Sequence, residues 1–151
     1  MLSLRTVQSD VQRVAEAIAV ALGVDVEITD RDLIRVAGTG EFSRQLGNSL
    51  AGQGRVHAHV LQIGATITIE DPGHHELCRT CVMAKRCYAT AELCCPINHQ
   101  GGIVGVMGLV SHTQAQRRRL LDNVRANVAF LERMADLLSA KITSEEATAR
   151  D

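Results

Sequence analysis

The chain has 151 residues, 46% of them hydrophobic, and a formal net charge of −1. This length fits one domain, and the near-neutral charge with only 2% aromatic residues argues against direct nucleic-acid binding. The sequence has neither an apolar run long enough to span a membrane nor the basic start and apolar core of a signal peptide. We therefore expect a cytoplasmic domain that does not enter a membrane.

The amino-terminal third predicts a helix followed by a hairpin of two strands. Apolar residues from Val7 to Ala21 recur at steps of three and four, which is the spacing of an amphipathic helix, and Gly23 is expected to end it. Apolar and polar residues then alternate over 24–29, which predicts a half-buried strand. Residues 33–37 are expected to form the returning strand.

The middle of the chain predicts a short helix and three further strands. Residues 41–47 favour the helix, whereas 48–64 show no sustained period and are expected to be mostly loop. The strands are expected at 65–69, 93–98 and 103–110. The last of these is apolar on both faces, so we expect it to lie at the centre of a sheet that is covered on both sides.

A heptad pattern of apolar residues over 121–142 predicts a long carboxy-terminal helix. A second apolar row within 120–137 would allow one row to pack on the sheet and the other on a partner chain. The polar residues 143–151 are expected to be a frayed tail or linker after a single domain over 1–142. Together these elements predict an α+β fold, an antiparallel five-stranded sheet flanked by amino- and carboxy-terminal helices, with the helices segregated to one side.

All five cysteines lie in one stretch with the spacing C-x2-C-x5-C-x6-C-C. In a reducing compartment such a cluster favours metal ligation or redox chemistry over structural disulfides. The predicted ligands are Cys78, Cys81, Cys87 and Cys95. Adjacent residues on a strand face opposite sides, so only one of the last two is expected to ligate, and Cys94 is the alternative fourth ligand.

The wide and uneven spacing of the cysteines favours an iron–sulfur cluster, most simply 4Fe-4S, over zinc, which commonly uses two C-x2-C pairs. A thiol/disulfide switch is a third interpretation, and haem held by Cys94 and a histidine is the least favoured. His74 and His75 precede the cysteines and are read as an exposed pair rather than ligands. His57 and His59 lie in the predicted loop without ligand spacing.

The sequence contains no phosphate-binding loop, dinucleotide fingerprint, nucleophile elbow or H-E-x-x-H motif, which are common signatures of enzymes. Glu92 has no catalytic partner nearby in sequence. The chain is therefore predicted not to be an enzyme.

The run from Cys95 to Val110, followed by Thr113, Gln114, Gln116 and a leucine-rich helix, resembles the PAS-like (PAS/GAF) amino-terminal sensor domains of bacterial enhancer-binding transcription activators. A subgroup of that family carries a four-cysteine insertion just before the same hairpin. The resemblance implies a PAS-like fold, a homodimer through the amino- and carboxy-terminal helices, and an iron–sulfur cluster as sensory cofactor.

The resemblance also implies a function: a redox- or gas-sensing domain of a transcriptional regulator, with a downstream regulatory domain or the transcription machinery as its partner. The alternative is a PAS-like module that binds a small metabolite, with a structural zinc in the cysteine loop. A small redox enzyme or electron carrier is a third hypothesis, which the lack of a charged docking patch disfavours.

Overall fold

The computed structural model describes residues 3–52, 54–79 and 87–150. Within these residues five strands form one sheet in the spatial order β2-β1-β5-β4-β3, and every neighbouring pair is antiparallel. The strands are β1 Asp25–Asp30, β2 Arg35–Gly38, β3 Ile67–Ile69, β4 Ala91–His99 and β5 Gly102–Ser111. The predicted five-stranded antiparallel sheet is thus confirmed, with the strand predicted over 103–110 at its centre.

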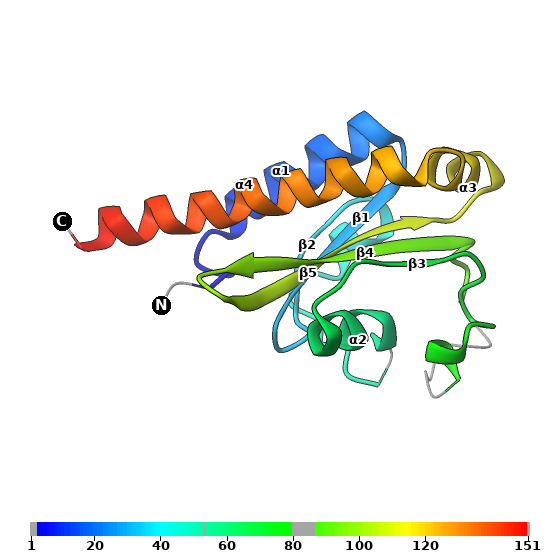
Figure 1. Ribbon diagram of the computed structural model, residues 1–151, viewed down its shortest axis with the longest axis horizontal. Coiled ribbons are helices and arrows are strands. Elements are labelled where there is room, and N and C mark those ends of the chain that lie inside the picture. Colours follow the sequence, from blue (N-terminus) through cyan, green and yellow to red (C-terminus); the bar gives the residue numbers. More distant parts are fainter. Residues whose placement is uncertain (1–2, 53, 80–86, 151) are drawn as a thin grey trace.

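Helices lie on both faces of this sheet (Figure 1). The α-helices of the described residues are α1 Gln8–Leu22, α2 Arg55–Ile63, α3 Gln114–Leu121 and α4 Val124–Arg150, and the 3-10 turns are η1 Gly40–Arg44 and η2 Glu76–Cys78. Helices α1 and α4 pack against one face, and α2 packs against β4 and β5 on the other. None of the described helices is long and apolar enough to cross a membrane.

The first helix forms where its apolar stripe predicts. Val11, Ala15 and Ile18 are buried on one side of α1, and they pack into the main core together with β1, β5 and α4. Gly23 takes a left-handed conformation with φ of 68° and donates its N–H to the carbonyl of Ala19, which is the expected helix end.

Two apolar clusters sandwich the sheet. The larger cluster lies between the sheet and helices α1 and α4 and includes Ile28, Leu93 and Leu131. The smaller one lies beneath α2 and includes Val60 and Val106. Alternate residues of β4 and β5 therefore point into different layers, as the pleat of a strand requires.

The expectation of a loop over 48–64 is wrong, because α2 occupies Arg55–Ile63. With nine residues, α2 is too short to show a repeated period, and its buried positions Val56, His57 and Val60 include a histidine. Gly54 and Gly64 flank it and made the segment look irregular. Helix α2 also overturns the expectation that the helices are segregated to one side of the sheet.

The carboxy-terminal helix predicted over 121–142 is confirmed as α4 from Val124 onward, and a separate helix, α3, ends at Leu121 just before it. The side chain of Asn127 is buried and donates hydrogen bonds to the carbonyls of Arg119 and Leu120, 3.0 and 2.9 Å away, so it caps the end of α3 where the chain turns into α4. Helix α4 then continues through Arg150. Residues 143–150, expected to be a frayed tail or linker, are helical, so fraying is wrong and the linker stays a prediction.

Candidate functional site

A cavity of about 250 Å³ lies on the α2 side of the sheet, between the sheet, η1, α2 and the segments that carry the cysteines. Its walls combine charged, aromatic and thiol side chains. The lining residues are Glu27, Arg35, Glu41, Phe42, Gln45, Leu50, Gly54, Arg55, Val56, His57, Gly73, Cys78, Cys87, Tyr88, Ala89, Glu92, Val110 and His112.

The sheet beneath α2 has a gap in its side-chain layer at Gly108 of β5. Gly108 stands opposite Glu27 of β1 and Cys94 of β4. A Cβ atom at position 108 would lie 2.9 Å from Nε2 of His57 and 3.3 Å from Sγ of Cys94. Glycine therefore leaves room for the imidazole of His57 to approach the sheet.

A buried ion pair joins β1 to β2 in the cavity wall. The Arg35 guanidinium donates to Oε1 of Glu27 through Nε at 2.9 Å and through Nη2, and both side chains are less than 10% exposed. The guanidinium also donates to the carbonyl of Gln45 and lies over the Phe42 ring, 5.2 Å from its centroid. These contacts fix Arg35 in place.

His57 is the most deeply buried ionisable group in the wall, with 3% exposure. Its Nδ1 lies 2.7 Å from the hydroxyl oxygen of Thr29. Its Nε2 has no hydrogen-bond partner among the described residues and lies 3.7 Å from Oε2 of Glu27. Burial lowers the pKa of His57 more than the Glu27 carboxylate raises it, so the imidazole is neutral near pH 7.

Glu92 of β4 places a further carboxyl group in the cavity wall. Burial, and secondarily the negative charge of Glu27, raise the pKa of Glu92 to about 7. Near neutral pH this carboxyl group can therefore donate as well as accept a hydrogen bond. The wall thus offers carboxyl groups, a guanidinium and a neutral imidazole to a bound molecule.

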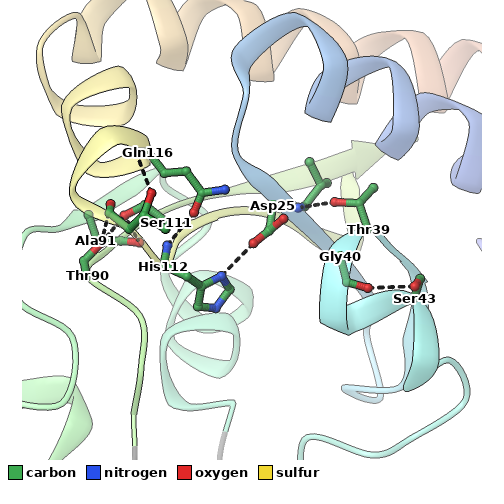
Figure 2. A network of polar contacts seen from close by, with 11 residues as sticks. Asp25, Thr39, Gly40, Ser43, Thr90, Ala91, Ser111, His112 and Gln116 are labelled. Carbon is green, nitrogen blue, oxygen red and sulfur yellow. Dashed lines mark hydrogen bonds and ion pairs between the residues drawn. The ribbon is translucent and has the colours of Figure 1, made fainter.

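His112 connects the cavity to the carboxy-terminal helices (Figure 2). Its Nδ1 lies 2.6 Å from Oδ2 of Asp25, and its ring lies 5.7 Å from that of Phe42. Its backbone N–H donates to Oε1 of Gln116 in α3 at 2.7 Å, and Thr113 caps the same helix by accepting from the Gln116 N–H. His112 therefore touches both the cavity and the start of α3.

The structure brings two of the predicted ligands to the cavity and separates the other two described cysteines. Cys78 and Cys87 line the cavity, whereas Cys81 lies outside the described residues. Cys94 is buried in the cluster beneath α2, and Cys95 is buried in the opposite core beneath α1 and α4. The expected opposite orientation of this adjacent pair is confirmed.

Of this adjacent pair, Cys94 faces the side of the sheet on which Cys78 and Cys87 lie, which favours it over Cys95 as a fourth ligand. Burial raises the pKa of the Cys94 thiol well above its usual value and that of Cys95 to about 12, so ligation would have to displace a proton. Within 3–52, 54–79 and 87–150, no three histidine, cysteine or acidic residues are grouped as a metal site. The ligand set stays a prediction.

Sequence reasoning missed the charged residues of the cavity. Glu27 and Thr29 form the polar side of the alternation over 24–29, which suggested a solvent-facing surface, but both residues are buried beneath α2. Arg35 likewise interrupts an apolar strand and is buried. Charged residues of opposite sign on two strands of one predicted hairpin were the available signal for a buried pair.

Comparisons with known proteins agree on the family. The GAF domain model matches residues 3–142. A curated relative from Escherichia coli strain K12, the putative uric acid sigma-54-dependent transcriptional regulator UacR, is 31% identical over 143 residues. The match covers 95% of this chain and 24% of the relative, so the chain spans about a quarter of that protein's length.

Solved structures share the fold at lower identity. A methyl-accepting chemotaxis protein fragment has a TM-score of 0.70 at 22% identity, with 91% of this chain and 89% of that chain covered. The type II free methionine-R-sulfoxide reductase of Thermoplasma acidophilum has a TM-score of 0.68 at 17% identity, with 91% of this chain and 94% of that chain covered. The cofactor-binding GAF domain of the nutrient sensor CodY from Clostridium difficile has a TM-score of 0.59 at 15% identity, covering 87% and 83%.

These likenesses to solved structures support the fold alone, whereas the family model covers nearly the whole chain. The sensor-domain resemblance expected from the hairpin is therefore confirmed at the level of the family, while its iron–sulfur subgroup stays a prediction. The chain belongs to the GAF domain family.

Proposed function

We propose that this GAF domain is the signal-sensing, non-enzymatic domain of a sigma-54-dependent transcriptional regulator, and that its signal is a small molecule bound in the cavity. The role in transcription is inferred from the E. coli relative, of which the chain matches 24%. The partner would be a downstream regulatory domain or the transcription machinery, and the predicted homodimer through the terminal helices remains part of this proposal.

The observation that carries the proposal is the set of buried ionisable groups around the cavity. Glu27, Arg35 and His57 are each less than 10% exposed, and a protein buries such groups at a cost that function commonly explains. A polar molecule in the cavity would give them further hydrogen-bond partners. A largely apolar pocket would need none of these groups.

A urate-like oxopurine is the ligand that best combines the chemistry of the cavity with the name of the relative, which is a putative uric acid regulator. Urate is planar and carries C=O and N–H groups around its rings. The former can accept from Arg35 and His57, and the latter can donate to Glu27 and Glu92. The Phe42 ring in the same wall offers a flat apolar surface.

A structural change caused by ligand binding would be transmitted from the cavity to the carboxy-terminal helices through His112. A ligand that shifts the His112 ring would disturb its contact with Asp25 and its backbone hydrogen bond to Gln116 at the start of α3. Helix α3 leads directly into α4, whose packing on the sheet could take two arrangements. The ligand would favour one of them through its differential affinity.

Isothermal titration calorimetry with urate tests this proposal. We expect saturable binding with one urate per chain, and a marked loss of affinity in Glu92→Ala, which removes a carboxyl group from the cavity wall. The matched control is Glu70→Ala, because Glu70 is exposed and does not line the cavity. Absence of binding, or equal weakening in both variants, would contradict the proposed ligand site.

The second candidate is a metal-based redox or gas sensor in the cysteine loop, and the presence of Cys78 and Cys87 in one cavity wall favours it. With Cys81 and a fourth thiolate, they would hold a 4Fe-4S cluster, which can change with redox state or a diatomic gas. The predicted fourth ligand is Cys95, but the orientation of Cys94 favours the alternative. Zinc bound by the same cysteines would instead be a structural site that stabilises the loop.

Metal and sulfide analysis of protein purified without oxygen tests the second candidate. About four irons and four sulfides per chain would support an iron–sulfur cluster, and one zinc per chain would support a structural zinc site. Loss of the metal in Cys94→Ser but not in Cys95→Ser would identify the fourth ligand. Protein without iron, sulfide or zinc would refute both metal hypotheses and leave the small-molecule proposal in place.

A further inference from the structure

We propose that Nε2 of His57 and Oε2 of Glu27 form a recognition pair for a lactam edge, in which a C=O group lies next to an N–H group on the ligand. The inference rests on the proposed function, since it assumes that a small molecule occupies the cavity. It identifies the atoms that would select the chemical class of that molecule.

The tautomer of His57 follows from its two neighbours. Thr29 lies at Nδ1, and its hydroxyl can either donate or accept. Glu27 lies at Nε2, where its carboxylate oxygen attracts a proton and repels a lone pair. The neutral imidazole therefore carries its proton on Nε2 and accepts at Nδ1 from the Thr29 hydroxyl.

This arrangement leaves a buried donor unsatisfied. At 3.7 Å the Glu27 oxygen is beyond hydrogen-bond distance of Nε2, and no other acceptor is present among the described residues. Buried donors are almost always paired, so an acceptor oxygen brought by a ligand would supply the missing bond. Gly108 lets the imidazole reach this position beside Glu27, because a Cβ atom at residue 108 would lie 2.9 Å from Nε2.

The carboxylate of Glu27 supplies the second half of the pair. Both of its hydrogen bonds from Arg35 go to Oε1, whereas Oε2 is the oxygen that lies near His57. A ligand N–H next to the C=O group would donate to Oε2. A ligand carboxylate has no N–H group to donate to Oε2 and would place one carboxylate directly against another, so the pair selects lactams over carboxylates.

Two substitutions at one position separate recognition from folding. His57→Gln keeps an amide N–H near the place of Nε2, whereas His57→Asn keeps a polar group near the place of Nδ1 and can bond only to Thr29. We expect calorimetry with urate to show a loss of about 10- to 100-fold in His57→Asn and a smaller loss in His57→Gln. The reverse order would show that His57 serves only to hold Thr29, and would overturn the inference.

The tautomer provides a test that needs no ligand. Two-bond ¹⁵N–¹H correlation spectra of the wild-type chain should show the proton of His57 on Nε2, and a proton on Nδ1 would overturn the inference whatever urate does. Failure of wild-type protein to bind urate would instead overturn the proposed ligand. The two failures are therefore observed in different experiments.

Discussion

Replacing Glu92 with glutamine should remove a pH dependence of stability that wild-type protein shows. Burial and the nearby Glu27 raise the pKa of Glu92 from its ordinary value of 4.5 to about 7. The unfolded chain therefore ionises Glu92 at lower pH than the folded chain does. The contribution of Glu92 to the free energy of unfolding is therefore fully present below about pH 4.5, and this contribution is lost as the pH rises through 7.

The difference between the two pKa values corresponds to about 3 kcal/mol. Because Glu92 retains some solvent exposure, water screens part of this cost, and we expect about 2–3 kcal/mol. Glu92→Gln should be more stable than wild type by this amount at pH 8, and the gap should narrow toward pH 5.

Urea unfolding at pH 5 and pH 8, followed by circular dichroism, measures both free energies of unfolding. Glu70→Gln is the matched control, because Glu70 is exposed and does not line the cavity. Parallel pH profiles for wild type and Glu92→Gln would refute the assignment of Glu92 as a desolvated carboxyl group of the cavity.

Three further predictions concern the pair in the wall, the core and the output route. Arg35→Met should lower the free energy of unfolding by about 3–5 kcal/mol, because it leaves Glu27 buried without its partner. Adding Glu27→Gln to this variant should recover most of that loss. Denaturant unfolding measures both changes. Leu131→Ala, at a fully buried site of α4, should lower the free energy of unfolding by about 2–5 kcal/mol. Leu137→Ala is the control, because Leu137 is 58% exposed and its truncation should change thermal stability little. Similar losses in the two variants would refute the packing of α4. His112→Leu should bind urate within a few-fold of wild type, yet lose any urate-dependent change in hydrogen exchange of α3, and a retained change would refute the proposed route.

The sheet could be predicted because its signals are local. Alternation placed β1, and an apolar run on both faces placed β5 at the centre, where it pairs with β1 and β4. Helix α2 was missed because its nine residues span fewer than three turns, too few to show a period. The break before α4 was missed because Asn127 caps α3 through contacts that an unbroken heptad pattern does not reveal.

The candidate site was less predictable because it is assembled from distant segments. The cysteine spacing drew attention to residues 78–95, and the structure does place Cys78 and Cys87 in the cavity wall. Glu27 and Arg35 looked like ordinary polar residues of a hairpin. Their importance depends on α2 covering that face of the sheet, and sequence periodicity gave no indication of that cover.

The most direct test of the account is a ¹⁵N–¹H correlation spectrum of the labelled chain titrated with urate. We expect saturable shifts concentrated on the cavity side of the sheet, at Glu27, His57, Glu92 and His112, with smaller changes continuing into α3. Absence of saturable shifts, or shifts concentrated on α1 and the outer face of α4, would contradict the claim that this cavity is the sensing site.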